Sequence, residues 1–142
     1  AANEKAKVEV QSEAKALLES VQAYCDKQLA GITEDKSENP LSASRRLNRM
    51  IALFKGDAWG KPFEEIQAQI KTDKAFQAEV KAAEVLELLK ADANRIGLGS
   101  DPQALKRTEA ASIAQTLDQI CKQFSATKAA KEAASLKATW FR

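Results

Sequence analysis

The sequence predicts an all-α protein, a single domain over residues 1–142 built as an irregular bundle of four to five helices. Apolar residues recur at steps of three and four positions over most of the chain. Only five glycines and three prolines interrupt its 142 residues. No segment shows the alternation of apolar and polar residues that is typical of strands. Hydrophobic residues make up 44% and charged residues 30%, a balance that favours a folded chain over a disordered one.

A long first helix is expected over roughly residues 3–30. Gly31 is of the kind favoured just past a helix end. The next segment, TEDKSENP over residues 33–40, is polar and rich in turn-forming residues, so we expect a loop there. The apolar stripe of the helix is spaced by four and three residues: Val10, Ala14, Leu17, Val21, Tyr24 and Gln28.

A second helix is expected to start at Pro40, with Asn39 as its cap, and to end at Gly56. A short third helix opens at Pro62 with acidic residues in its first turn, where the helix dipole favours them, and ends near Lys71.

The fourth helix is expected to follow a cap at Thr72 or Asp73 and to end in the glycines of RIGLG, residues 95–99. A long fifth helix is then predicted from Ser100-Asp101-Pro102 to the end of the chain. Its pattern weakens in the alanine-rich residues 126–142, which we interpret as a looser C-terminal extension that frays or binds something.

Two cysteines occupy similar helical settings. SEAKALLESVQAYCDKQLA runs from Ser12 to Ala30, and TEAASIAQTLDQICKQFSA from Thr108 to Ala126. Shared patterning of alanine-rich helices accounts for this similarity better than an internal duplication does. If the first and last helices are neighbours, Cys25 and Cys121 come within the Cα separation of about 4.4–6.8 Å that a disulfide needs. We therefore expect a Cys25–Cys121 disulfide, the alternative being two unrelated buried thiols.

A disulfide would indicate the periplasm or the extracellular space. Ala1-Ala2 before a charged helix start is what signal-peptide removal leaves, although a chain trimmed at this point would look the same. The sequence therefore predicts a mature exported protein, periplasmic or secreted. No apolar run approaches the roughly 18 residues of a spanning helix, so no stable membrane insertion is expected.

Catalysis, metal binding and cofactor binding are not expected. The chain has no histidine, which removes the usual general base and nearly all catalytic zinc sites. The glycines form no phosphate-binding loop, and a net charge of +2 does not favour nucleic acid as a partner. Acid pairs give only a very weak catalytic signal, since acids in a first turn or beside a proline are ordinarily dipole partners or caps. These acids are Glu64-Glu65 with Asp57, and Asp92 with Asp101.

Three features are candidate contacts for another protein. Arginine side chains on the second helix could dock an acidic surface, or form a solvated helix face. A tryptophan between glycines could anchor a partner or cover the core, and an aromatic pair near the end of the chain raises the same choice. The residues are Arg45, Arg46, Arg49, Trp59, Trp140 and Phe141.

The function predicted by this combination is binding, as an inhibitor, immunity or adaptor protein that acts on another protein. The alternative is a carrier of a small apolar ligand or lipid, held between helices in a pocket lined by residues such as Phe54, Phe76 and Leu89.

Overall fold

The computed structural model describes residues 2–142, which form six α-helices and two short 3-10 helices and contain no strand. The all-α prediction is confirmed, whereas the prediction of four to five helices is wrong. The elements are α1 (Ala2–Glu38), α2 (Pro40–Leu53), η1 (Ala58–Gly60), α3 (Lys61–Thr72), α4 (Lys74–Ile96), η2 (Pro102–Lys106), α5 (Thr108–Gln123) and α6 (Lys128–Trp140).

The chain groups into two compact units, residues 1–68 and 69–142. The first unit holds α1, α2, η1 and the start of α3, and the second holds the end of α3 and everything after it. The predicted single domain stays a prediction, and each unit is described below by itself.

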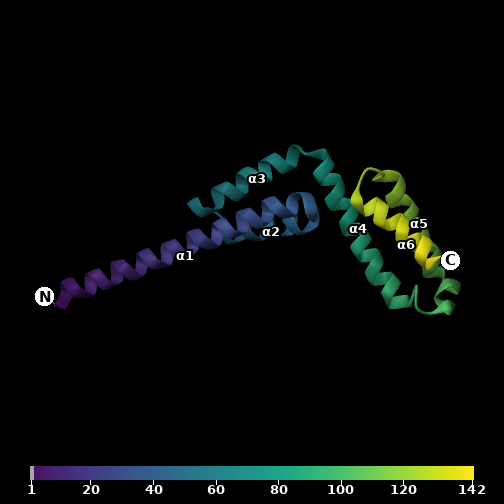
Figure 1. Ribbon diagram of the computed structural model, residues 1–142, viewed down its shortest axis with the longest axis horizontal. Helices are drawn as coiled ribbons and strands as arrows, with labels where there is room; N and C mark the ends of the chain where they lie inside the picture. Colours follow the sequence, from purple (N-terminus) through teal and green to yellow (C-terminus); the bar gives the residue numbers. More distant parts are fainter. Residues whose placement is uncertain (1) are drawn as a thin grey trace. The chain divides into compact units, whose positions relative to one another are not determined.

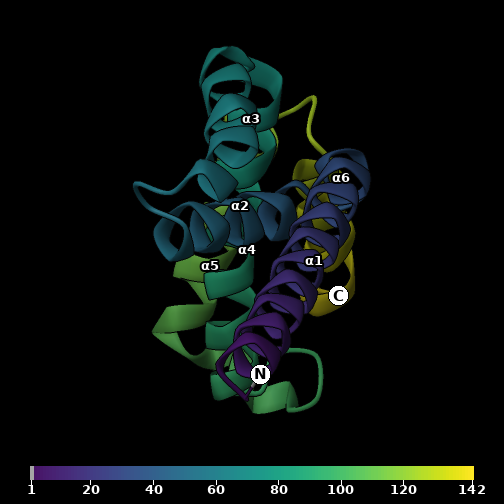
Figure 2. The same ribbon diagram turned by 90° about the vertical axis from the view of Figure 1, so that its left-hand side faces the viewer.

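The first unit is built on a hairpin of α1 and α2, which lie side by side and antiparallel (Figure 1, Figure 2). Asn39 alone separates them, and its side chain accepts a hydrogen bond from Ser42 N, so the predicted cap and helix start are confirmed. On the α1 side, Asp35 accepts from Ser42 Oγ at 2.9 Å and pairs with Arg46 at 3.5 Å. These contacts fix the turn between the two helices.

The predicted helix end at Gly31 and the predicted loop over residues 33–40 are wrong, because α1 continues to Glu38. Gly31 has an ordinary helical backbone, and the guanidinium of Arg46 occupies the place where a side chain at position 31 would stand. Asp35 must be helical to face Arg46 across the hairpin. Tertiary contacts with α2 thus override the local turn propensity of this segment.

The core of the first unit lies between the second half of α1, α2 and the start of α3. Phe63 is fully buried, and its ring stacks on that of Phe54 with centroids 6.3 Å apart. Between these two aromatics the chain turns through Gly60, where an added Cβ would lie 2.6 Å from the carbonyl oxygen of Phe54. The remaining buried residues are Cys25, Ile32, Leu41, Ala43, Leu47 and Met50.

The second unit is a three-helix arrangement in which α4, α5 and α6 contact one another (Figure 1). Asp73 caps α4 by accepting from Phe76 N, as predicted, and Gly97 ends the helix in the left-handed conformation. One cluster of buried residues joins the three helices, including Leu86, Ile96, Leu117, Ile120 and Ala133.

The predicted long fifth helix is wrong, because the chain breaks it into η2, α5 and α6. Asp101 and Pro102 start only the 3-10 helix η2. A second break follows Phe124, and Thr127 caps α6 by accepting from Ala130 N at 3.0 Å. Within α6 the alanines at positions 129, 130 and 133 are buried, so this part of residues 126–142 packs on the core of its unit.

The predicted disulfide is also wrong, because Cys25 and Cys121 are both free thiols. Cys25 is 3% exposed in the α1–α2 hairpin of the first unit. Cys121 belongs to the second unit, where its Sγ lies 3.5 Å from the carbonyl oxygen of Ala130. Cys25 is buried in the first unit and Cys121 is half-buried in the second, and the last helix is α6 rather than the helix that carries Cys121.

Candidate functional site

The first half of α1 is exposed to solvent on all sides. Every described residue from 2 to 20 is exposed, including apolar side chains that a soluble helix would ordinarily bury. Val10 is 64% exposed, Leu17 66% and Leu18 56%, and Tyr24, nearly two turns further on, is 43% exposed. We call the apolar face formed by Val10, Ala14, Leu17, Leu18, Val21 and Tyr24 the α1 stripe.

The α1 stripe continues the face that α2 covers in the second half of the same helix. Its spacing of four and three residues runs on through Cys25, Gln28 and Ile32, which are buried or half-buried in the hairpin. Arg46 lies beside Gly31, and Leu53, the last residue of α2, lies two turns further along. The cover therefore ends near the height of Tyr24 and Cys25, and Figure 1 shows α1 extending past α2 beyond this point.

Helix α5 shows how the second unit treats the same pattern. Aligned through the two cysteines, Ala14 corresponds to Ala110 and Leu17 to Ile113. Ala110 is 1% exposed and Ile113 6%, because α4 and α6 pack on this face of α5. The corresponding face of α1 is open, so the difference lies in the neighbours and not in the residue types.

Charges of both signs surround the α1 stripe, so no single-sign field marks it. Lys15 and Glu19 form an exposed i,i+4 pair at 3.9 Å, and Gln22 donates to Asp26 at 2.7 Å. Such exposed contacts support the helix weakly and are screened by salt. Hydrophobic contact is therefore the main interaction that this face offers.

The three arginines of the predicted docking face differ in their surroundings. Arg46 is half-buried and pairs with Asp35, so it joins α2 to α1. Arg45 and Arg49 are exposed on α2. Their contact with an acidic partner stays a prediction, whereas Arg46 has a structural role in the hairpin.

Each predicted aromatic contact is half-buried. Trp59 lies in η1, where Asp57 accepts from its backbone N–H. Trp140 and Phe141 pack against the core of the second unit, and the Trp140 ring approaches within 3.0 Å of the place where a Cβ on Gly99 would stand. Gly99 has a φ of +86°, a conformation that also disfavours other residues. The arrangement favours docking of the chain end onto its unit, and partner binding by these aromatics stays a prediction.

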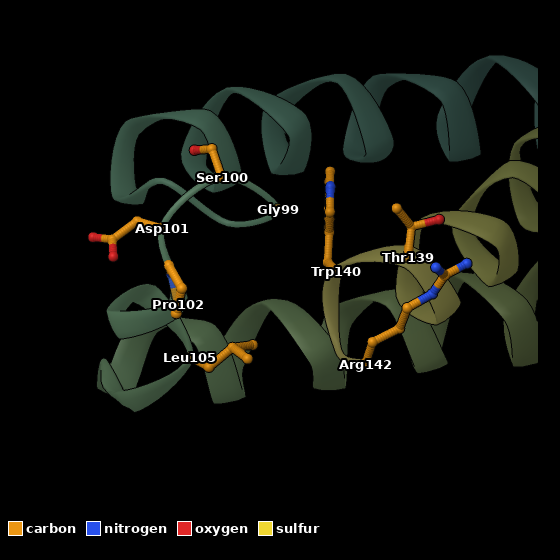
Figure 3. A pocket seen from close by; sticks show the side chains of 8 residues that line it. All are labelled: Gly99, Ser100, Asp101, Pro102, Leu105, Thr139, Trp140 and Arg142. Carbon is orange, nitrogen blue, oxygen red and sulfur yellow. The ribbon is translucent and has the colours of Figure 1, made fainter.

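Two shallow pockets lie in the second unit. One, of about 240 Å³, is bounded by Trp140, Leu105 and the turn at Gly99 and Asp101 (Figure 3). The other, of about 370 Å³, lies between α5 and α6 beside Cys121, with the Asp118–Lys137 ion pair at its wall. Neither is lined by Phe54, Phe76 or Leu89, the residues predicted for an apolar carrier site. Phe76 and Leu89 are buried in α4, and Leu89 belongs to the core cluster.

The Cys25 thiol is a buried group at the end of the covered part of α1. Burial raises its pKa, and the nearby carboxylates of Asp26 and Asp57 raise it further. Asp57 belongs to the turn after α2 and caps η1. The thiol is therefore held in its neutral, weakly nucleophilic form.

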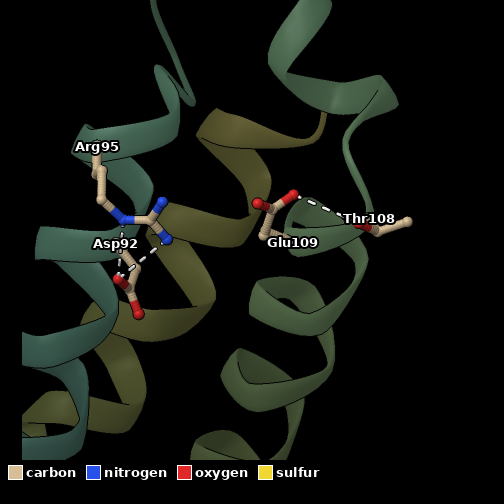
Figure 4. A network of polar contacts seen from close by, with 4 residues as sticks. All are labelled: Asp92, Arg95, Thr108 and Glu109. Carbon is tan, nitrogen blue, oxygen red and sulfur yellow. Dashed lines mark hydrogen bonds and ion pairs between the residues drawn. The ribbon is translucent and has the colours of Figure 1, made fainter.

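The acids that gave the weak catalytic signal have structural roles at helix ends. Asp57 and Asp101 cap η1 and η2. Asp92 pairs with Arg95 at 3.4 Å in the last turns of α4, and Figure 4 shows this pair apart from the local Thr108–Glu109 contact on α5. Over residues 2–142 no group of His, Cys, Asp or Glu is placed to hold a metal ion. In the same residues, no helix has both the length and the apolar character to cross a membrane.

The α1 stripe is the feature that sequence reasoning missed. Its spacing was recognised as a helix face, but the spacing alone does not say whether a neighbour covers it. The signal available was length: α2 has 14 residues and α1 has 37, so a hairpin partner of this size leaves much of α1 uncovered.

Comparisons of the chain with protein-family models, curated proteins and solved structures found no match.

Proposed function

We propose that this protein acts by binding other proteins, as an adaptor, inhibitor or immunity protein would, and that the α1 stripe is its contact surface. The observation that carries this proposal is the exposure of Val10, Leu17 and Leu18 on a continuous helix face. These side chains lie next to one another on one face rather than scattered singly, and a contiguous exposed apolar face is a candidate interaction surface.

The chemistry of the stripe favours an amphipathic helix as the bound element. In both places where the same apolar spacing is covered, under α2 in the first unit and under α4 and α6 in the second, the covering element is a helix. Helix-in-groove recognition uses anchors at steps of three and four residues, which is the spacing of the stripe.

A carrier function has less support. The pocket beside Cys121 is open, and an ion pair forms part of its wall, whereas carrier sites enclose most of an apolar ligand. Export also stays a prediction, without the support of a disulfide, since both cysteines are free.

Site-specific photocrosslinking in the native cells tests the proposed function. Benzoylphenylalanine placed at Leu17 lies on the stripe, and at Ala16, which is also exposed, it lies about 100° around the helix and off the stripe. We expect a discrete protein adduct from position 17 and none from position 16. Equal adducts from both positions, or none from position 17, would contradict a contact surface on this face.

A further inference from the structure

We propose that the α1 stripe is occupied by a second copy of this chain, packed antiparallel, so that the protein forms a weak and reversible dimer through α1. This inference rests on the proposed function, because it assigns the same surface: the weak dimer covers the α1 stripe in the free protein and separates when another protein binds there. It starts from the continuity of the stripe with the α1–α2 interface, which shows that an antiparallel helix fits this face of α1.

The position of α2 decides the orientation of the pair. α2 occupies the stripe side of α1 from Glu38 back to about Cys25. In a parallel pair, the second half of the other α1 would run at these same heights and would compete with α2. In an antiparallel pair it lies on the N-terminal side of residue 8 of the first helix instead, away from most of α2 in that copy. Residues 7–24 of the second copy then cover the part of α1 that α2 leaves open.

An antiparallel pair also matches side-chain sizes. With the two-fold axis between Lys15 and Ala16, Val10 of each copy faces Val21 of the other. Ala14 faces Leu17, which sets a small side chain against a large one, as close packing requires. The spacing of four and three residues is the repeat that keeps two helices in contact along a seam.

The ends of this paired segment are also filled. Lys7 of each copy comes level with Tyr24 of the other, where its alkyl stem can lie on the ring while its ammonium group reaches water. The first turn of each α1 comes level with the last turn of α2 in the other copy, so the two α1 helices cross at a small angle and this turn lies beside Leu53, which is 61% exposed. The same surface serves both copies, as the two-fold symmetry of a closed dimer demands.

The size of the surface predicts weak association. Residues 8–24 span about 25 Å at 1.5 Å per residue, and a helix face about 10 Å wide gives a footprint of about 250 Å² on each copy. Stable specific interfaces exceed about 1,000 Å² in total, so this interface belongs to the weak and reversible class. We expect a dissociation constant in the micromolar range, with rapid exchange between monomer and dimer.

Sedimentation velocity over a concentration series tests the dimer. We expect the wild-type chain and Ala16→Glu to shift from monomer to dimer alike, and Leu17→Glu to raise the dissociation constant by at least about tenfold. Ala16→Glu is the matched control, because it adds the same carboxylate at the residue before Leu17, which lies off the α1 stripe. Val10→Glu is the second stripe variant, and circular dichroism checks that each variant keeps its helix content.

The orientation is tested in the same chain with benzoylphenylalanine at Val10, followed by mass spectrometry of the crosslinked dimer. Attachment near Val21 of the second copy supports the antiparallel pair, and attachment near its Val10 overturns it. A wild-type chain that stays monomeric, or a Leu17→Glu chain that dimerises like wild type, also overturns the inference. If such a monomer still gives an adduct with a different protein from position 17, the proposed function survives and only the identity of the partner fails.

Discussion

Leu17 and Leu47 are the same residue type on the two helices of one hairpin, and their truncation should have very different costs. Leu17 is 66% exposed and Leu47 only 2%. Complete burial of a leucine contributes about 1.5–3 kcal/mol, so the buried third of Leu17 contributes at most about 1 kcal/mol. The better helix propensity of alanine offsets a few tenths of this. Leu47→Ala removes a packed core side chain, for which the cost is about 2–5 kcal/mol.

Urea unfolding monitored by tryptophan fluorescence measures both costs. Trp59 lies in the first unit and Trp140 in the second, so a Trp140→Phe background reports on the first unit alone. The chain is kept dilute, so that the α1 stripe stays free. We expect Leu17→Ala to leave the midpoint nearly unchanged and Leu47→Ala to lower it strongly.

A cost for Leu17→Ala close to that of Leu47→Ala in dilute solution would refute the reasoning, because it would mean that the monomer buries the stripe. Should Leu47→Ala unfold the unit without urea, Ile32→Val is the milder core truncation, with an expected cost of about 0.5–1.5 kcal/mol. Ile32 has no exposed surface and lies in the covered half of α1.

The remaining predictions concern one glycine pair, one cap and the two thiols. Gly60→Ala should destabilise the first unit by about 1–3 kcal/mol, because a backbone carbonyl oxygen lies 2.6 Å from the new Cβ and cannot move aside as a side chain can. Gly31→Ala, whose new Cβ meets only the end of an arginine side chain, should be neutral or stabilising in the same urea assay. Thr127→Ala should cost the second unit about 1 kcal/mol in thermal unfolding, because α6 loses its capping oxygen, and no loss would contradict the cap. In peptide mapping after maleimide treatment, Cys25 should be modified far more slowly than half-buried Cys121, and equal rates would contradict the burial of Cys25. Because the pKa of Cys25 is raised, the folded protein favours the neutral thiol. This stabilisation is complete below the ordinary pKa of about 9 and is lost as pH rises through the raised value. The stability difference between wild type and Cys25→Ala should therefore change only in alkaline solution.

Local chemistry predicted the parts of the fold that depend on neighbours in sequence. The Asn39 cap with Pro40, the Asp73 cap and the break at Gly97 are all made by residues within four positions of one another. Such signals are complete in the sequence, because the donor, the acceptor and the required backbone conformation lie on one short segment.

The wrong predictions depend on contacts between distant residues. Gly31 is a helix breaker by propensity, yet α1 runs through it to Glu38, where Asp35 contacts Ser42 and Arg46 of α2. The two cysteines share a pattern, yet they lie in different units, Cys25 buried and Cys121 half-buried. The pattern indicates which face of a helix is apolar, and only the fold determines which element covers that face.

The candidate site was predictable in part for the same reason. Val10, Ala14 and Leu17 are identifiable as one helix face from their spacing alone. Their exposure depends on where α2 ends, and that follows from the position of the hairpin turn at Asn39. The arginines and tryptophans were predicted as partner contacts because these residue types are common in interfaces. Their exposure could not be predicted from the sequence, because it depends on the packing of the folded chain.

Amide hydrogen exchange of α1, followed along the helix at low and high protein concentration, tests most directly whether the stripe is a docking surface. An uncovered helical extension opens easily, whereas residues 25–36 are held by α2. We predict that residues 8–20 exchange much faster than residues 25–36 in dilute solution and become protected as the concentration rises. Two results would contradict a docking surface on α1. One is that residues 8–20 are already as protected as residues 25–36 in dilute solution. The other is that their exchange rate does not fall as the protein concentration rises.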